Sequence, residues 1–219
     1  MKLNQMKSDN QNNKQNIKNL ESFYDQRSLE WKKLYEDKLY PSDLAKIYRG
    51  KLAKHYVNKF INHNSKILDA GCGAGKVLLD LVDNYNVEGI DVSSKMIELC
   101  NQEFESAKII KNKYKFSVGN LFDSNFHEKT FDGIIALGFL EYQVNENKSL
   151  KYLRSLIKPN GYLIISGPSN IRLYNYFGLV SIIEILRRFF NKKKRDDYKE
   201  DWETICLHKY SIQRFKKYY

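Results

Sequence analysis

The chain has 219 residues, which is enough for one ordinary domain with a sizeable hydrophobic core. No stretch has the roughly 20 consecutive apolar residues of a membrane-spanning helix, and the first residues lack the apolar segment of a secretory signal. The three cysteines have neither metal-ligand nor disulfide spacing, so we expect a cytoplasmic protein without a bound metal. The net charge of +11 comes from lysines scattered along the chain, so we expect no nucleic-acid partner.

The first 64 residues differ in composition from the rest of the chain. Residues 1–20 are rich in Asn, Gln and Lys and have few bulky apolar side chains, a composition that cannot offset the entropy of ordering and predicts a disordered tail. Residues 21–64 bring in apolar side chains at spacings of three and four, which predicts an N-terminal helical segment. Residues 65–219 form the principal domain.

In that domain, short apolar runs alternate with helical patterns. The runs predict strands at residues 66–70, 87–93, 114–120, 131–138 and 162–168, with helices at 75–85, 94–105 and 148–157. Alternation at this spacing is typical of parallel strands joined by crossover helices, so we expect an α/β fold with a doubly wound parallel sheet. Such a sheet binds ligands at the carboxyl ends of its strands.

Three glycines follow the first predicted strand, in the sequence "KILDAGCGAGK". A phosphate-binding P-loop is excluded, because Ala70 stands where its first glycine is needed and Val77 where Ser or Thr is needed. A dinucleotide-binding loop has a glycine three positions after Gly73, where this chain has Lys76, so only a shifted variant of that motif stays open.

The run "ILDAGCGAGKV" resembles motif I of the class I S-adenosylmethionine-dependent methyltransferases. Four further segments resemble the family's later strand motifs in the same order: "VEGIDVSSKMIELC", "FSVGNLFD", "FDGIIALGFLEY" and "LIKPNGYLIIS". The match runs from about Phe23 to Lys217. It implies a Rossmann-like fold for residues 65–219, with S-adenosyl-L-methionine as the cofactor.

The resemblance implies which residues hold the methionine end of the cofactor. The glycines would let the backbone come close to the ligand, and an acidic residue at the end of the first strand would face its ammonium group. The residues expected at this end are Asp69, Gly71, Gly73 and Gly75. Cys72 and Leu137 are also expected to contact the cofactor.

The resemblance also implies the residues of the adenosine end. Asp91 would accept both ribose hydroxyls, although an NAD-binding fold uses an acidic residue in the same place. Val92 and Met96 would flank the adenine, Asn120 would accept its amino group, and the N–H of Leu121 would face the ring. Alternatives stay open: Asp91 as a helix N-cap, Met96 as core and Asn120 as a turn residue.

The segment "ALGFLEY" after the fourth strand bears on the acceptor. It lacks the prolines of nucleic-acid amino-methyltransferases, and it is closer to quinone-type O-methyltransferases. Those enzymes often have a pattern of acidic and histidine residues that is thought to hold a metal, and of this pattern the chain has only Glu141. Glu141 is expected to be either a catalytic residue or a structural cap. His208 is the other candidate for a catalytic base, or a surface histidine. Tyr24 and Trp31 would wall the site or belong to the core.

These observations predict methyl transfer from S-adenosylmethionine to a small-molecule or lipid-like acceptor at oxygen. The alternative is a non-catalytic, degenerate cofactor-binding or partner-binding protein. Residues 171–195 form an amphipathic pattern ending in basic residues, which predicts peripheral membrane contact or a lid helix. The chain ends at Tyr219, before the last two strands of the family's seven-stranded sheet, so we expect a five-stranded parallel core with an uncovered edge.

Overall fold

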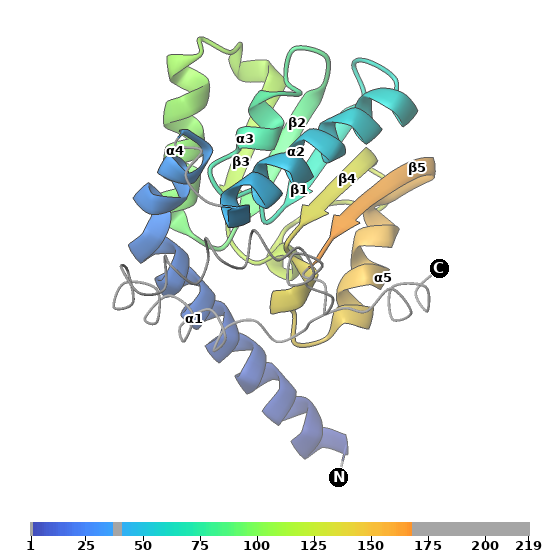
Figure 1. Ribbon diagram of the computed structural model, residues 1–219. Helices are drawn as coiled ribbons and strands as arrows, with labels where there is room; N and C mark the ends of the chain where they lie inside the picture. Colours follow the sequence, from blue (N-terminus) through green and yellow to red (C-terminus); the bar gives the residue numbers. More distant parts are fainter. Residues whose placement is uncertain (1, 37–40, 168–219) are drawn as a thin grey trace, which may run out of the picture.

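A computed structural model describes residues 2–36 and 41–167, with side chains placed at 13–30 and 46–167. The described residues contain a five-stranded parallel sheet of order β3-β2-β1-β4-β5, shown in Figure 1. Its strands are β1 (Lys66–Ala70), β2 (Asn86–Asp91), β3 (Tyr114–Val118), β4 (Phe131–Leu137) and β5 (Ile157–Ser166). The α/β prediction is therefore confirmed. The expected loss of two further strands falls on residues 168–219, outside the described residues.

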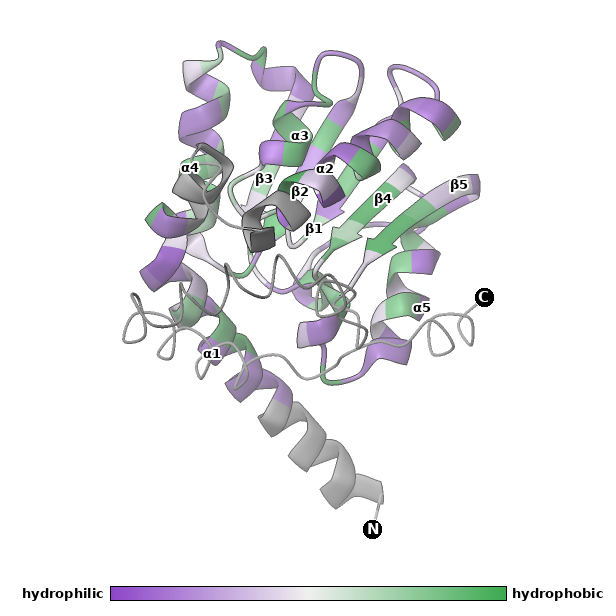
Figure 2. Cartoon of the chain, in the orientation of Figure 1, coloured by the Kyte–Doolittle hydropathy of each residue, from purple (hydrophilic) through white to green (hydrophobic). Residues whose placement is uncertain are grey.

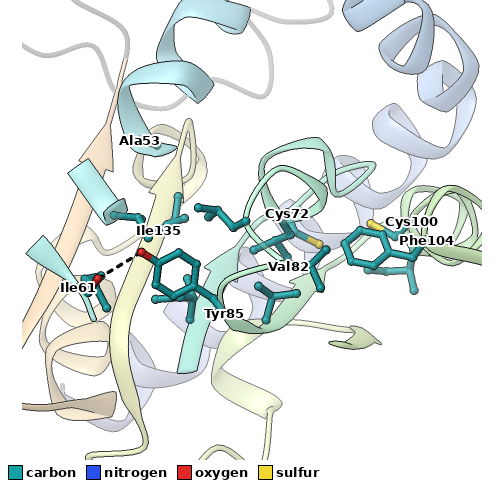
Figure 3. Packing of buried hydrophobic residues seen from close by; sticks show 14 residues of the cluster. Ala53, Ile61, Cys72, Val82, Tyr85, Cys100, Phe104 and Ile135 are labelled. Atoms are coloured by element: carbon teal, nitrogen blue, oxygen red, sulfur yellow. Dashed lines mark hydrogen bonds between the residues drawn. The ribbon is translucent and has the colours of Figure 1, made fainter. Parts of the chain in front are cut away.

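Helices cover both faces of the sheet. Helices α2 (Pro41–Phe60), α3 (Lys76–Leu79) and α4 (Ser94–Ser106) pack on one face, and α5 (Glu146–Leu156) packs on the other (Figure 1). Two hydrophobic cores result: the first lies between the sheet and α2, α3 and α4, and the second lies between the sheet and α5. Side chains alternate along each strand, so Ile67 lies in the first core and Leu68 in the second. Figure 3 shows the first core, in which the buried Tyr85 donates a hydrogen bond to the carbonyl of Ile61. In Figure 2 β4 is largely hydrophobic, as a parallel strand covered on both faces must be.

Two predicted elements have different bounds in the structure. The helix expected at 75–85 is helical only over Lys76–Leu79 and then becomes a turn. The turn places Tyr85 in the core, where its hydroxyl also reaches Asn58 at 3.1 Å, and β2 starts at the next residue. β5 begins at Ile157 rather than 162, because the left-handed Asn160 (φ 64°) lets an irregular segment join the strand before its regular pairing.

Residues 2–20, for which the composition predicts a disordered tail, belong in the structure to one long helix, α1 (Lys2–Glu36). Residues 2–36 contain no Gly or Pro, so nothing in the backbone interrupts the helix. Tertiary contacts anchor it: Leu20 and Phe23 are buried, and Asn16 donates a hydrogen bond of 2.7 Å to the carbonyl of Tyr142. The amino end of α1 projects away from the sheet (Figure 1). The described residues of the segment 21–64 include the rest of α1 and α2.

None of the helices among the described residues combines the length and the apolar character that a membrane span requires. The segment 171–195, for which membrane contact was predicted, lies outside the described residues.

Candidate functional site

The glycine loop lies at the carboxyl end of β1, where the sheet topology predicts a ligand site. Gly71, Gly73 and Gly75 have φ angles of 77°, 52° and 72°, a left-handed region in which a side chain is strained. The backbone N–H groups of Gly71 and Cys72 both donate to the carbonyl of Ile90, at 2.8 and 3.1 Å. The loop is thus attached to the end of β2.

The glycines of the loop face different surroundings. A Cβ at Gly75 would lie 2.6 Å from Sγ of Cys100, so this glycine is needed for packing against α4. Within the described ranges, a Cβ at Gly73 would meet no atom within 4 Å, so this glycine faces open space there. Gly73 is therefore where a ligand has room to lie directly against the backbone.

Asp91, at the end of β2, holds this loop. Its Oδ2 accepts the N–H of Gly73 and its Oδ1 accepts the N–H of Ser93, each at 2.9 Å. The N-cap of α4 is Ser93, whose hydroxyl accepts the N–H of Met96 at 3.1 Å, so Asp91 does not have that role. Burial raises the pKa of Asp91, the two N–H groups oppose the rise, and the nearby Asp25 carboxylate adds to it.

Helix α1 reaches the same edge of the sheet through Asp25, a residue that the sequence pattern did not single out. Its Oδ1 accepts the hydroxyl of Ser93 at 2.5 Å and the N–H of Lys95 at 3.1 Å. Its neighbour Tyr24 makes an edge-to-face contact with Tyr142, with ring centroids 6.0 Å apart. Tyr24 and the predicted adenine contact Val92 both pack against the buried Leu20 and Phe23. The side chain of Trp31 lies outside the described part of the chain.

The other residues predicted to contact the adenosine interact with neighbouring residues of the chain. The Oδ1 of Asn120 accepts the N–H of Phe122 at 3.3 Å and caps the short helix Leu121–Asp123, as the turn alternative predicted. Leu121 is buried. Met96 is 1% exposed, and its side chain lies at the first turn of α4.

Two more predicted residues, Cys72 and Leu137, pack in the hydrophobic core next to the loop. Cys72 is buried, and a hydrogen bond to Cys100 and burial together raise the pKa of its thiol well above the usual value. Figure 3 shows both cysteines in the core beneath the loop. Leu137 is half-buried at the end of β4 and packs on the same core. Their neighbours are core side chains, so these residues support the loop.

Asp69 and Glu141 are the two buried carboxyl groups next to the loop, each 3% exposed. Burial raises the pKa of Asp69 to about 7, the charge of Asp91 adds to the rise, and the guanidinium of Arg49 opposes it. Burial likewise raises the pKa of Glu141 to about 7, against the opposing effects of its own backbone N–H and of Arg49. Arg49 of α2 was not found by sequence reasoning, because no motif marks it.

The three acidic residues of the site lie along the carboxyl ends of the strands in the order of those strands in the sheet. Asp91 ends β2, Asp69 lies in β1, and Glu141 follows β4 in the turn Leu140–Tyr142. Because β1 lies between β2 and β4, the turn that carries Glu141 lies on the side of Asp69 away from Asp91. His208 lies outside the described residues and is not placed. Within the described ranges, no group of three or more His, Cys, Asp or Glu side chains could hold a metal ion.

Comparison with known proteins gives a family match. A family model described as a methyltransferase domain matches residues 61–217. The O-methyltransferase rstn1 of Aspergillus nomiae is 30% identical over 103 residues, which are 46% of this chain and 45% of that protein. The ubiquinone/menaquinone biosynthesis C-methyltransferase UbiE of Geotalea daltonii is 26% identical over 148 residues, 63% of this chain and 62% of that protein. The matches thus span less than two thirds of these relatives.

Solved structures share the fold. The YcgJ protein of Bacillus subtilis superimposes with a TM-score of 0.55 at 15% sequence identity, over 78% of this chain and 65% of that chain. At this identity the likeness concerns the fold alone, and it agrees with the parallel sheet and flanking helices described above.

Proposed function

This chain belongs to the class I S-adenosylmethionine-dependent methyltransferases, and from that premise we propose that it transfers a methyl group from S-adenosylmethionine to an oxygen of a small-molecule acceptor. The observation that carries the proposal is the glycine loop: Gly73 faces open space among the described residues and donates its N–H to Asp91, whose charge acts on the nearby carboxyl of Asp69. A backbone surface with acidic groups at both ends suits a ligand that carries an ammonium group at one end and a ribose at the other.

The residues of the loop fit the cofactor of the family. A carboxylate has about four lone-pair positions. Asp91 can therefore keep its bonds to Gly73 and Ser93 and still accept ribose hydroxyls. Asp69, buried and pointing to the α2 face of the sheet, would accept the ammonium group of the methionine end. Val92 and Tyr24 would lie beside the adenine, with the N–H of Leu121 facing the ring.

The bound cofactor supplies a methyl carbon on a sulfonium, an electrophile that mainly requires alignment with the acceptor. The protein must also remove a proton when the acceptor is a hydroxyl. Glu141 suits this role, because a pKa of about 7 lets a carboxylate take a proton near neutral pH. The two relatives named above methylate oxygen and carbon according to their names, so the choice of oxygen rests on Glu141. His208 stays the second proposed base.

Turnover with a defined panel of acceptors tests this proposal. Purified protein would be incubated with isotope-labelled S-adenosylmethionine and small phenols, hydroxy acids and hydroquinones, and methylated products detected by mass spectrometry. We expect acceptor-dependent formation of S-adenosylhomocysteine, which Asp91→Ala should strongly reduce. Cofactor binding without any methylated product would instead support the non-catalytic alternative.

A further inference from the structure

Large apolar side chains form an exposed row along α2, which lies over β4 and β5 (Figure 1). The row has one residue at every fourth position: Tyr48, Leu52, Tyr56 and Phe60. Their exposed fractions range from 37% to 64%. Residues four apart lie on the same side of a helix, so these side chains form one strip, called the α2 row below. The side of α2 that packs on the sheet has other apolar residues, such as the buried Ala53 and Val57, so the core does not account for the α2 row.

The α2 row continues onto the strand β5. The rings of Tyr56 and Phe60 are stacked with their centroids 6.1 Å apart, and the ring of Phe60 stacks on that of Tyr162 at 5.3 Å. Tyr162 is also exposed, by 42%. Among the described residues, β5 is the last strand on its side of the sheet. An exposed apolar surface that continues from a helix to a strand is typical of a docking site for a protein or a membrane.

A second exposed row on α2 is basic. Lys51, His55 and Lys59 are exposed and also four residues apart, each one position before a residue of the α2 row. The ring of His55 contacts that of Tyr56 with centroids 5.5 Å apart, and Nζ of Lys59 lies 5.2 Å from the ring centroid of Phe60. Residues 44–60 include five Lys or Arg and no Asp or Glu. The apolar surface is therefore bordered by charges of one sign.

The charge distinguishes between the possible occupants of this surface. A second copy would bring the same basic row and a net charge of +11, so like charges would oppose pairing. Residues 168–219 have 12 Lys or Arg against six Asp or Glu, so their excess charge is also positive. A single-stranded nucleic acid would need free ring faces for its bases, but the rings of Tyr56, Phe60 and Tyr162 stack on one another. Anionic headgroups match the basic row, and the headgroup region suits Tyr, Phe and Leu side chains.

We propose that the outer face of α2, together with Tyr162, docks on the surface of a bilayer that contains anionic lipid. The α2 row enters the boundary between headgroups and acyl chains, and Lys51 and Lys59 contact lipid phosphates. The α2 row begins at Tyr48, and the terminal nitrogens of the next residue, Arg49, lie 3.0 and 3.2 Å from the Cβ position of Gly138 at the end of β4. Docking therefore holds the carboxyl edge of the sheet close to the lipid. The inference does not depend on the proposed methyl transfer.

Co-sedimentation of the full chain with vesicles tests this inference without any cofactor. Vesicles of phosphatidylcholine alone are compared with vesicles that contain about one third phosphatidylserine, at low and at physiological salt. We expect binding to the anionic vesicles to be about tenfold or more tighter, and to weaken as salt is added. Tyr56→Ser/Phe60→Ser should weaken that binding about tenfold or more, because two rings no longer enter the bilayer. Lys51→Gln/Lys59→Gln should weaken it by a similar factor, through the lost attraction to lipid phosphates.

Matched control variants lie at the other end of the sheet, beside β3. Ile110→Ser changes an apolar side chain that is 68% exposed. Lys108→Gln/Lys115→Gln removes two exposed cations, the same change in net charge as in the α2 variant. Both controls should bind the anionic vesicles within about threefold of the unmodified protein, because charge and exposure alone do not make the docking surface.

No sedimentation with anionic vesicles, or losses in the control variants as large as those in the α2 variants, would overturn the proposal. A dimer in size-exclusion chromatography that Tyr56→Ser/Phe60→Ser dissociates would also overturn it and assign the surface to a second copy. Displacement of the vesicles by a single-stranded oligonucleotide, lost in the same variant, would assign the surface to nucleic acid. Thermal melting checks that each variant folds. Tyr48→Ser, at the most exposed position of the α2 row, is the second test if the double variant does not fold, and it should weaken vesicle binding several-fold.

Discussion

The carboxylate of Asp91 accepts the backbone N–H of Gly73 at 2.9 Å, which ties the end of β2 to the middle of the glycine loop. Its other oxygen accepts the N–H of Ser93, at the start of α4. One side chain thereby fixes both backbone segments that border the open space at Gly73. Asp91 has two roles in our account: it shapes the loop, and it contacts the ribose.

Asp91→Ala should therefore weaken binding of both S-adenosylmethionine and S-adenosylhomocysteine. Loss of charge-assisted hydrogen bonds costs roughly 1.5–3 kcal/mol, which corresponds to about 10- to 100-fold in affinity measured by calorimetry. Asp132→Ala is the matched control, because Asp132 also accepts a backbone N–H, that of Lys66 at 2.8 Å, but at the opposite edge of the sheet. The control should lower the melting temperature and leave the affinity unchanged. Equal affinity losses in both variants would contradict the role of Asp91.

Alanine at Gly73 and at Gly75 should have different effects. Both glycines have left-handed backbone, so either substitution costs about 1–2 kcal/mol of stability. Gly75→Ala also places its Cβ 2.6 Å from Sγ of Cys100, which adds roughly 1–3 kcal/mol of overpacking. Gly73→Ala makes no such contact with the described residues, but its methyl group enters the open space. Denaturant unfolding should show the larger loss for Gly75→Ala, whereas calorimetry with the gentler Gly73→Ala should show a large loss of cofactor affinity. A Gly73→Ala protein that binds normally would place the ligand elsewhere.

Cofactor affinity should increase with pH up to about 7. The pKa of Asp69 is raised to about 7 by burial and by Asp91, with Arg49 opposing, so this carboxyl is largely protonated below that pH. Binding of an ammonium group favours the ionised form, and the protein must then release a proton. Affinity at pH 5 should be up to about 100-fold lower than at pH 8, because each pH unit below the pKa costs tenfold. Titrations in buffers of different ionisation enthalpy would detect the released proton. Asp69→Asn should bind weakly at every pH, and a pH-independent affinity in the unmodified protein would contradict this assignment.

Glu141 should make the stability of the ligand-free protein depend on pH. Its pKa is raised by burial from 4.5 to about 7, so the folded state binds this proton more tightly than the unfolded chain does. The stabilisation is complete below about pH 4.5 and is lost as the pH rises through 7, by roughly 3 kcal/mol. Glu141→Gln, which is neutral at all pH values, should therefore raise the melting temperature at pH 8 relative to the unmodified protein and change it little at pH 5. A melting temperature lowered by Glu141→Gln at pH 8 would show that the ionised carboxylate has a stabilising partner.

The sheet could be predicted from the sequence because each buried parallel strand corresponds to a short run of apolar residues. "KILDA" became Lys66–Ala70 and "FDGIIALG" became Phe131–Leu137 with one residue of difference. The glycine loop could also be predicted from a short stretch of sequence, since its positive φ angles favour glycine at those positions. The acid at the end of the second strand, Asp91, was placed correctly by its distance from the loop.

The rest depends on contacts between distant parts of the chain. The composition of the first 20 residues predicted disorder, but the helix there is stabilised by the packing of Leu20 and Phe23 against residues near Val92 and Tyr142, which no local pattern shows. Met96 occupies a helix start that is typical of the family, yet its neighbours enclose it. Arg49 meets Glu141 only because α2 crosses the carboxyl end of β4. Contacts between residues so far apart in the sequence can be seen only in the three-dimensional structure.

The central claim is that the glycine loop and Asp91 hold S-adenosylmethionine rather than a nicotinamide dinucleotide, whose ribose an acidic residue at this position could equally accept. Parallel calorimetric titrations of the purified chain with S-adenosylhomocysteine and with NAD test this most directly. We predict saturable one-to-one binding of S-adenosylhomocysteine and no detectable binding of NAD. Binding of NAD, or no heat with S-adenosylhomocysteine, would contradict the account.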